Sequence, residues 1–262
     1  MENFDYEKKI YGVEESPRFK LSEPEIARRL PVEFRSVSGK ILEVGCGAGA
    51  FTGTIKRKRL DLEIYGVDIS KKAIKIARKD FPDIKFSVAS AYRLPFPDDF
   101  FDATVMNHVL EHLDDPDKAL AELGRVLKPG GLFWSTTPLE GDWLVLSPPR
   151  RLAEKYHGHL QRFSRASLLS LLERNNFRVE RYYFWGFLLC QVIGVVYLFL
   201  LDLFKLPPHF SVKSYVTRDS RAPGRSLLSF LRKFVSFLLN IESLLVPDRF
   251  PGYFMHIVAR KV

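Results

Sequence analysis

A glycine-rich turn between a predicted strand and a predicted helix constrains the fold of this chain more than any other feature. Residues 41–49 read Ile-Leu-Glu-Val-Gly-Cys-Gly-Ala-Gly, and a helix-forming stretch follows. An apolar run that ends in alternating glycines is typical of a buried parallel strand that turns sharply into a helix. Glycine permits the left-handed backbone of such a turn and lets a ligand approach bare peptide groups. The segment therefore predicts a cofactor site of the nucleotide-binding kind.

Strand and helix patterns alternate after this turn. The pattern predicts strands over 40–44, 62–68, 84–90, 101–107 and 132–137. It predicts helices over 51–59 and 71–80, and a third that opens at Asp115-Pro116 and ends at Gly130-Gly131. Such alternation is typical of parallel βαβ units with helices on both faces of the sheet. We therefore expect an α/β fold of the doubly wound type.

The pattern loosens after Pro138. We expect helices over 151–156 and 165–175, with Ser164 as N-cap of the second, and strands over 177–184 and 253–262. The chain is long enough for one core with an elaboration. We expect a single domain made of an N-terminal helical lid (1–38), a cofactor-binding core (39–182), an apolar helical insertion (183–250) and a closing strand (251–262).

Charge and cysteine content indicate which partners and which cell compartment to expect. The net charge of +9 favours anionic partners, although a solvated basic surface explains it equally well. The two cysteines, Cys46 and Cys190, lie far apart in sequence, so we expect no structural disulfide and a reducing, cytoplasmic location. The first residues carry acids and no apolar core, which argues against a secretory signal. The basic residues are scattered without a base-reading motif, so nucleic acid is not the expected partner.

Four motifs in this order resemble those of class I S-adenosylmethionine-dependent methyltransferases, in the small-molecule and quinone methyltransferase branch. They are Glu43–Gly49, Gly66–Ser70, Leu94-Pro95-Phe96 with Phe101-Asp102, and Leu127–Gly131. The resemblance covers about residues 38–185 and the last strand. It implies a Rossmann-like seven-stranded sheet, mostly parallel with an antiparallel last strand, and S-adenosylmethionine as the cofactor.

The resemblance also assigns the residues that hold the cofactor. Asp68 would accept hydrogen bonds from both ribose hydroxyls, since it ends the second strand about 20 residues after the glycines. Glu43 would orient the glycine turn and meet the ammonium of the cofactor, or serve only as a structural anchor of the turn. The complete predicted set is Glu43, Gly45, Cys46, Gly47, Gly49, Asp68, Ile69, Ser90, Ala91 and Asn107.

One position departs from the family pattern. Ser90 stands where the family usually places an acidic residue that binds the adenine amino group. A hydroxyl accepts the same hydrogen bond without charge assistance, so a non-catalytic binding module with this fold is the alternative. A nicotinamide dinucleotide site also fits Gly45-x-Gly47-x-x-Ala50 with Asp68. That third reading leaves Glu43 and the Leu-Pro-Phe segment unexplained.

Histidines supply the candidate catalytic groups. His108 follows the fourth strand, and its spacing to Glu111 and His112 would place the three on one face of a helix. Glu111 and His112 match part of a metal pattern of some quinone methyltransferases, but capping or packing is the favoured role and no metal is expected. His159, in a segment that resembles the family's substrate cleft, is a second acceptor-contacting candidate, in competition with a structural hydrogen bond.

The segment from Tyr183 to Leu201 carries no charge. Its length approaches the span of a bilayer, but a lone crossing would separate the last strand from the sheet. We expect a helical hairpin with residues 226–246 that lies on the cytoplasmic leaflet of the inner membrane or caps a greasy acceptor. The alternative is an internal helix or a homodimer interface. The predicted partners are a small lipophilic acceptor and anionic lipids, which would meet Arg218, Arg221, Arg225, Arg232 and Lys233.

Overall fold

A computed structural model describes residues 34–140, 158–203 and 252–262, together with Pro149, Leu152, Lys205, Leu245 and Val246. The chain divides into two compact units. The core unit contains the described residues of 18–138, 160–183 and 255–262, and the second unit contains those of 139–159 and 184–254. The predicted lid up to residue 33, most of the helix at 151–156 and most of the segment 226–246 fall outside the described residues.

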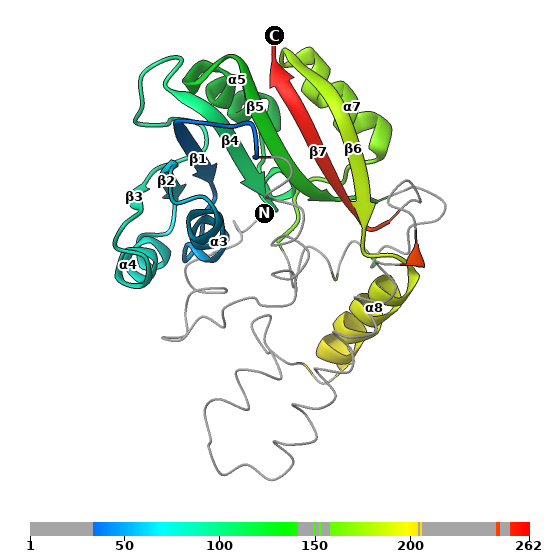
Figure 1. The fold of residues 1–262 in the computed structure, drawn as a ribbon. Coiled ribbons are helices and arrows are strands. Elements are labelled where there is room, and N and C mark those ends of the chain that lie inside the picture. The colour runs from blue at the N-terminus through cyan, green and yellow to red at the C-terminus, as the bar shows by residue number, and fades with distance from the viewer. Residues whose placement is uncertain are drawn as a thin grey trace. The chain divides into compact units, whose positions relative to one another are not determined.

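A seven-stranded sheet forms the centre of the core unit, in the order β3-β2-β1-β4-β5-β7-β6 (Figure 1). The first five strands pair in parallel. β7 runs antiparallel to β6, as two contacts show. Val262, just after β7, donates its backbone N–H to the carbonyl of Asn176, just before β6. His256, near the start of β7, stacks on Tyr183, near the end of β6. The strands are β1 (Lys40–Val44), β2 (Glu63–Asp68), β3 (Lys85–Val88), β4 (Phe101–Asn107), β5 (Leu127–Pro138), β6 (Phe177–Trp185) and β7 (Phe254–Lys261). The predicted mixed, doubly wound sheet is confirmed.

Helices follow the strands as the sequence predicts. They are α3 (Ala50–Lys58), α4 (Lys71–Asp80), α5 (Pro116–Val126) and α7 (Arg165–Arg174), with α8 (Leu188–Leu203) in the second unit. Asp115 and Ser164 are N-caps, as predicted, since each side chain accepts a hydrogen bond from a backbone N–H of the first turn. Trp134 on β5 stacks on Phe51 of α3 at 5.3 Å, which packs this helix against the sheet.

Several predicted boundaries are wrong. The helix α5 ends at Val126 rather than at Gly130-Gly131, because Leu127 is extended and pairs with Phe101 of β4. The fifth strand therefore starts at Leu127 and includes both glycines. The third strand is shorter than predicted, since Ser90 leaves it to form a turn whose carbonyl accepts a hydrogen bond from Arg93.

The uncharged segment from Tyr183 is divided between a strand and a helix. Tyr183, Phe184 and Trp185 complete β6, and Gly186, with a φ of +74°, ends the strand before α8 begins at Leu188. The insertion therefore starts later than the predicted residue 183. Among the helices in the described ranges, none has the length and apolar character needed to cross a membrane.

Candidate cofactor site

The turn after β1 requires its glycines. Gly45, Gly47 and Gly49 have φ values of +74°, +52° and +79°, which L side chains rarely adopt. A Cβ on Gly45 would also lie 2.4 Å from Cγ2 of Val109, and one on Gly49 would lie 2.8 Å from the Phe86 ring. At Gly45 and Gly49, both the backbone conformation and the available space therefore exclude larger residues.

Asp68 ties this turn to the end of β2. Its carboxylate accepts one hydrogen bond from the backbone N–H of Gly47, at 2.8 Å, and another from Ser70, at 2.9 Å. Each carboxylate oxygen can accept more than one hydrogen bond, so the pair of oxygens also suits a vicinal diol. Ile69, the next residue, is 68% exposed, and an apolar side chain in that position suits the face of an aromatic base.

Glu43 lies buried beneath the turn. The hydroxyl of Thr52, on α3, donates a hydrogen bond to its carboxylate. Burial raises the pKa of Glu43 to about 8, and the negative charge of Asp68 contributes in the same direction. The carboxyl group therefore holds a proton at neutral pH, and a cation placed beside it would favour the ionised form. Burial also raises the pKa of the Cys46 thiol, which makes this cysteine a poor nucleophile.

Ser90 and Ala91 follow β3 as predicted. The Ser90 hydroxyl accepts a hydrogen bond from the backbone N–H of Tyr92, at 3.2 Å. A hydroxyl oxygen has a second lone pair, so Ser90 is able to accept an amino hydrogen as well. Residues on either side of Ser90 line a cavity of about 430 Å³, formed by Val88, Ala89, Arg93, Leu94, Pro95 and Phe96.

Asn107 and His108 stand at the end of β4. The side-chain oxygen of Asn107 is buried, and no donor within the described part of the chain reaches it. A donor group of a bound ligand would satisfy this acceptor. The backbone N–H of His108 donates to Thr136 on β5, and His108 has a φ of +56°, which is rare for a residue with a side chain.

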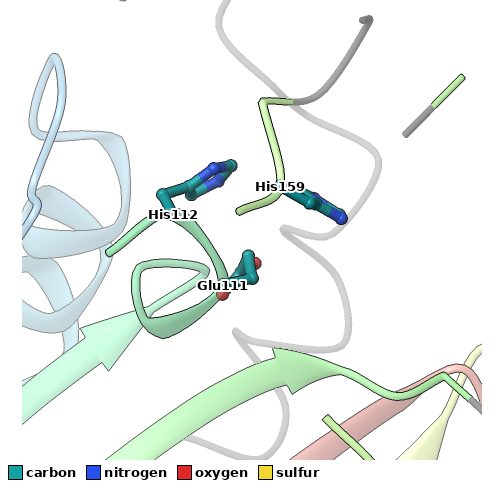
Figure 2. A group of neighbouring side chains, drawn as sticks. All are labelled: Glu111, His112 and His159. Atoms are coloured by element: carbon teal, nitrogen blue, oxygen red, sulfur yellow. The ribbon is translucent and has the colours of Figure 1, made fainter. Parts of the chain in front are cut away.

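His108 is paired with a buried carboxylate. Its Nδ1 lies 3.2 Å from the carboxylate of Glu111, which is 1% exposed. Glu111 and His112 lie on a 3₁₀ turn, η1 (Leu110–His112), shown in Figure 2. The predicted helix through His108, Glu111 and His112 is therefore wrong. His108 precedes the 3₁₀ turn, has a left-handed backbone conformation and contacts Glu111 from that position.

His159 falls in the second unit. It is buried, and its Nδ1 lies 4.0 Å from the carboxylate of Glu140. The next two residues along the chain, Leu160 and Gln161, belong to the core unit, where both donate their backbone N–H groups to the carbonyl of Glu111. The core unit thus brings together the glycine turn, Glu43, Asp68, Ser90 and the end of β4, whereas His159 is not part of it.

The sequence did not lead us to expect Thr52, Thr136 and Glu140 as neighbours of the predicted site residues. Thr52 is the third residue of α3, where a hydroxyl near a helix start is a signal worth weighing. Thr136 lies within an apolar strand, and only the register of β4 with β5 places it opposite Asn107. Nothing in the spacing of Glu140 indicated that it would lie beside His159.

Comparison with known proteins finds a methyltransferase domain in the same part of the chain. Residues 42–135 match the family described as "Methyltransferase domain". An uncharacterised methyltransferase of Schizosaccharomyces pombe is 37% identical over 41% of this chain and 43% of its own length. The demethylmenaquinone methyltransferase of Renibacterium salmoninarum is 39% identical over 40% of this chain and 44% of its own. The chain thus spans less than half the length of either curated relative.

A solved structure supports the fold. The geranyl diphosphate C-methyltransferase of Streptomyces coelicolor, in complex with Mg²⁺, geranyl diphosphate and S-adenosyl-L-homocysteine, aligns with a TM-score of 0.58. The alignment covers 92% of this chain and 78% of that one at 16% identity, so it shows the fold alone. The fold, the glycine turn with its acidic partner and the matched domain agree. Residues 42–135 thus match a methyltransferase domain, on a fold of the class I S-adenosylmethionine-dependent methyltransferase type.

Proposed function

We propose that this protein transfers the methyl group of S-adenosylmethionine to a small, lipophilic acceptor. The observation that carries the proposal is the Asp68 carboxylate, held at the glycine turn by hydrogen bonds from Gly47 and Ser70. This arrangement places an acceptor pair for a ribose diol beside the peptide groups of the glycine turn. Cofactor binding in class I methyltransferases uses both features.

The other residues of the core unit fit the remaining parts of the cofactor. Ile69 suits the adenine face and Ser90 its amino group, in a position where the hydroxyl replaces a carboxylate. The proton on Glu43 is lost when a cationic ammonium lies beside it, since the cation lowers the pKa of the carboxyl group. The buried oxygen of Asn107 accepts a hydrogen bond from the bound ligand.

His108 is the proposed proton acceptor. Bound S-adenosylmethionine supplies an electrophilic methyl group that passes to an oxygen or carbon of the acceptor as its bond to sulfur breaks. Glu111 orients the His108 ring through Nδ1, so that Nε2 faces away from the carboxylate and takes the proton that the acceptor loses. In-line positioning supplies most of the acceleration in this chemistry.

His159 is the second proposed acceptor-contacting residue. The support for this role comes from its own unit, where the Glu140 carboxylate lies 4.0 Å from Nδ1 and orients the ring. The dipeptide that follows it is fixed to the carbonyl of Glu111, so the chain on its carboxyl side has a defined position in the core unit.

The lipophilic nature of the acceptor rests on two kinds of support. One relative is named for demethylmenaquinone and one structural neighbour contains geranyl diphosphate, and both compounds carry isoprenoid carbon chains. This chain also has a long uncharged segment after β6, from 186 to 201. A reducing cytoplasmic location and peripheral membrane contact belong to the same proposal.

Radiolabelled methyl transfer to a lipid extract tests the function. We expect label in the organic phase with the wild-type protein and none with Asp68→Ala. A protein that binds S-adenosylmethionine but labels no lipid fraction would support the alternative of a non-catalytic binding module, which Ser90 favours. A protein that binds no S-adenosylmethionine would contradict both.

A further inference from the structure

A row of exposed apolar side chains runs along α8 in the second unit. Five residues on this helix are between 40% and 72% exposed: Leu188, Val192, Val196, Phe199 and Leu203. At 100° per residue they fall within a stripe about 80° wide, and they extend along about 22 Å of helix. No charged residue occurs between Arg181 and Asp202, so nothing in the sequence interrupts the stripe. This is an apolar surface in contact with solvent.

The other side of α8 is anchored. Phe187 and Gln191 are buried, and the Gln191 side chain donates a hydrogen bond to the Gly186 carbonyl at 3.1 Å. Gly186 also accepts a hydrogen bond from the backbone of Tyr253. The helix is therefore held at its first turn by its own unit, and its stripe faces outward.

Aromatic side chains gather where α8 begins. Trp185 stacks on Phe254 with ring centroids 5.4 Å apart, and Tyr253 packs edge-on against Phe254 at 4.8 Å. Tryptophan and tyrosine are enriched at membrane–water interfaces, because their rings are apolar and their N–H and O–H groups remain hydrated.

We propose that the α8 stripe docks onto the surface of an anionic phospholipid bilayer, with the helix axis in the plane of the interface. The proposal rests on the peripheral membrane contact of the proposed function and names α8 as the surface that makes it, whereas it does not depend on methyl transfer. The helix is too short to cross the hydrocarbon, which needs about 20 apolar residues, and interfacial helices bury one apolar face at the headgroup boundary. The sequence after α8 is basic, with Lys205, Lys213, Arg218, Arg221 and Arg225 against Asp219. Its positive charge complements anionic headgroups.

A second copy of the chain is a weaker occupant. A stable protein interface takes roughly 20–30 residues from each partner, whereas the stripe offers five. A dimer would also gain nothing from the basic sequence that follows, since two like-charged segments would repel each other.

Vesicle flotation of the full chain tests the proposal. The wild-type protein is expected to float with vesicles of phosphatidylcholine and phosphatidylglycerol, and less with phosphatidylcholine alone or at high salt. The triple variant Val192→Gln, Val196→Gln, Phe199→Gln keeps helix propensity and removes apolar area. We expect its partition constant to fall by roughly tenfold or more. Leu60→Gln, at a residue that is 76% exposed outside α8, is the matched control and should float as the wild type does.

The alternatives give different results. Equal flotation of wild type and triple variant, or no flotation of either, overturns the proposal. A change from dimer to monomer in the triple variant without vesicles assigns the stripe to a second copy. A lower melting temperature of the triple variant assigns the stripe to contacts within the chain, and either result overturns membrane docking. S-adenosylmethionine affinity, measured on the same variants, should not change, so a failure of the proposed function is recognised separately.

Discussion

The backbone N–H of Gly47 donates a 2.8 Å hydrogen bond to the carboxylate of Asp68, across 21 positions of sequence. This contact joins the turn after β1 to the end of β2 and places a carboxylate beside the peptide groups of that turn. Glu43 lies beneath the same turn, and the charge of Asp68 contributes to its raised pKa. The effects of these two carboxyl groups on stability, proton release and ligand binding can be measured directly.

The stability of the protein without ligand should depend on the protonation of Glu43. A carboxyl whose folded pKa is about 8 stabilises the fold fully below its unfolded pKa near 4.5, and this contribution is lost as the pH rises through 8. The free energy of unfolding of the wild type, relative to Glu43→Gln, should therefore fall with pH at up to about 1.4 kcal/mol per unit. Denaturant titrations of both proteins from pH 5 to 9 measure it, and parallel curves would show that Glu43 titrates normally.

Binding of S-adenosylmethionine should release a proton at pH 7. Glu43 holds a proton in the free protein, and a nearby ammonium or sulfonium lowers its pKa. Calorimetric titrations in buffers with different ionisation enthalpies give the number of protons released. We expect close to one for the wild type and close to zero for Glu43→Gln. An equal release from both proteins would place the proton on another group.

Gly45→Ala should destabilise the protein more than Gly130→Ala does. Both glycines have φ values near +70°, so each substitution carries a conformational cost of about 1–2 kcal/mol. A Cβ at 45 also meets Val109 at 2.4 Å, whereas one at 130 meets nothing within 4 Å. Overpacking adds about 1–3 kcal/mol at Gly45. The double variant Gly45→Ala, Val109→Ala should recover part of this difference in chemical denaturation, and equal costs at both glycines would contradict the tight packing.

Two substitutions of His108 separate its backbone from its ring. Asparagine tolerates the left-handed conformation at φ +56°, whereas alanine does so less well. His108→Asn should keep the melting temperature while it lowers kcat by about 10²-fold, the scale of a general base. His108→Ala should lower both. Full activity of His108→Asn would show that only the backbone conformation matters, and the kcat of Glu111→Gln tests the orienting carboxylate.

The sequence predicted those parts of the fold that local patterns specify. The bounds of β1, α4 and β4 agree with the predicted 40–44, 71–80 and 101–107, because apolar runs and the Ser70 N-cap mark them. The end of α5 was wrong, since Gly130-Gly131 looks like a helix stop although Leu127 already pairs with β4. Sheet register, which no local signal encodes, decided that boundary.

In the candidate site, too, the sequence predicted only what a local motif specifies. The glycines and Asp68 could be predicted from the sequence because a motif fixes their spacing. The bond from Thr52 to Glu43 and the contact of His108 with Glu111 depend on how α3 and η1 meet the strands, which the spacing of residues does not give. The exposure of the α8 stripe also depends on the fold. In a uniformly apolar segment, the sequence does not indicate which face of the helix is exposed.

A calorimetric titration with S-adenosylmethionine tests the central claim most directly. The wild type should bind it, and Asp68→Ala should weaken binding by about 10²-fold or more, the loss of two charge-assisted hydrogen bonds. Asp68→Asn, which keeps the shape and one acceptor, should fall between the two. No binding by a folded wild-type protein, or equal affinity of all three proteins, would contradict the assignment of this pocket.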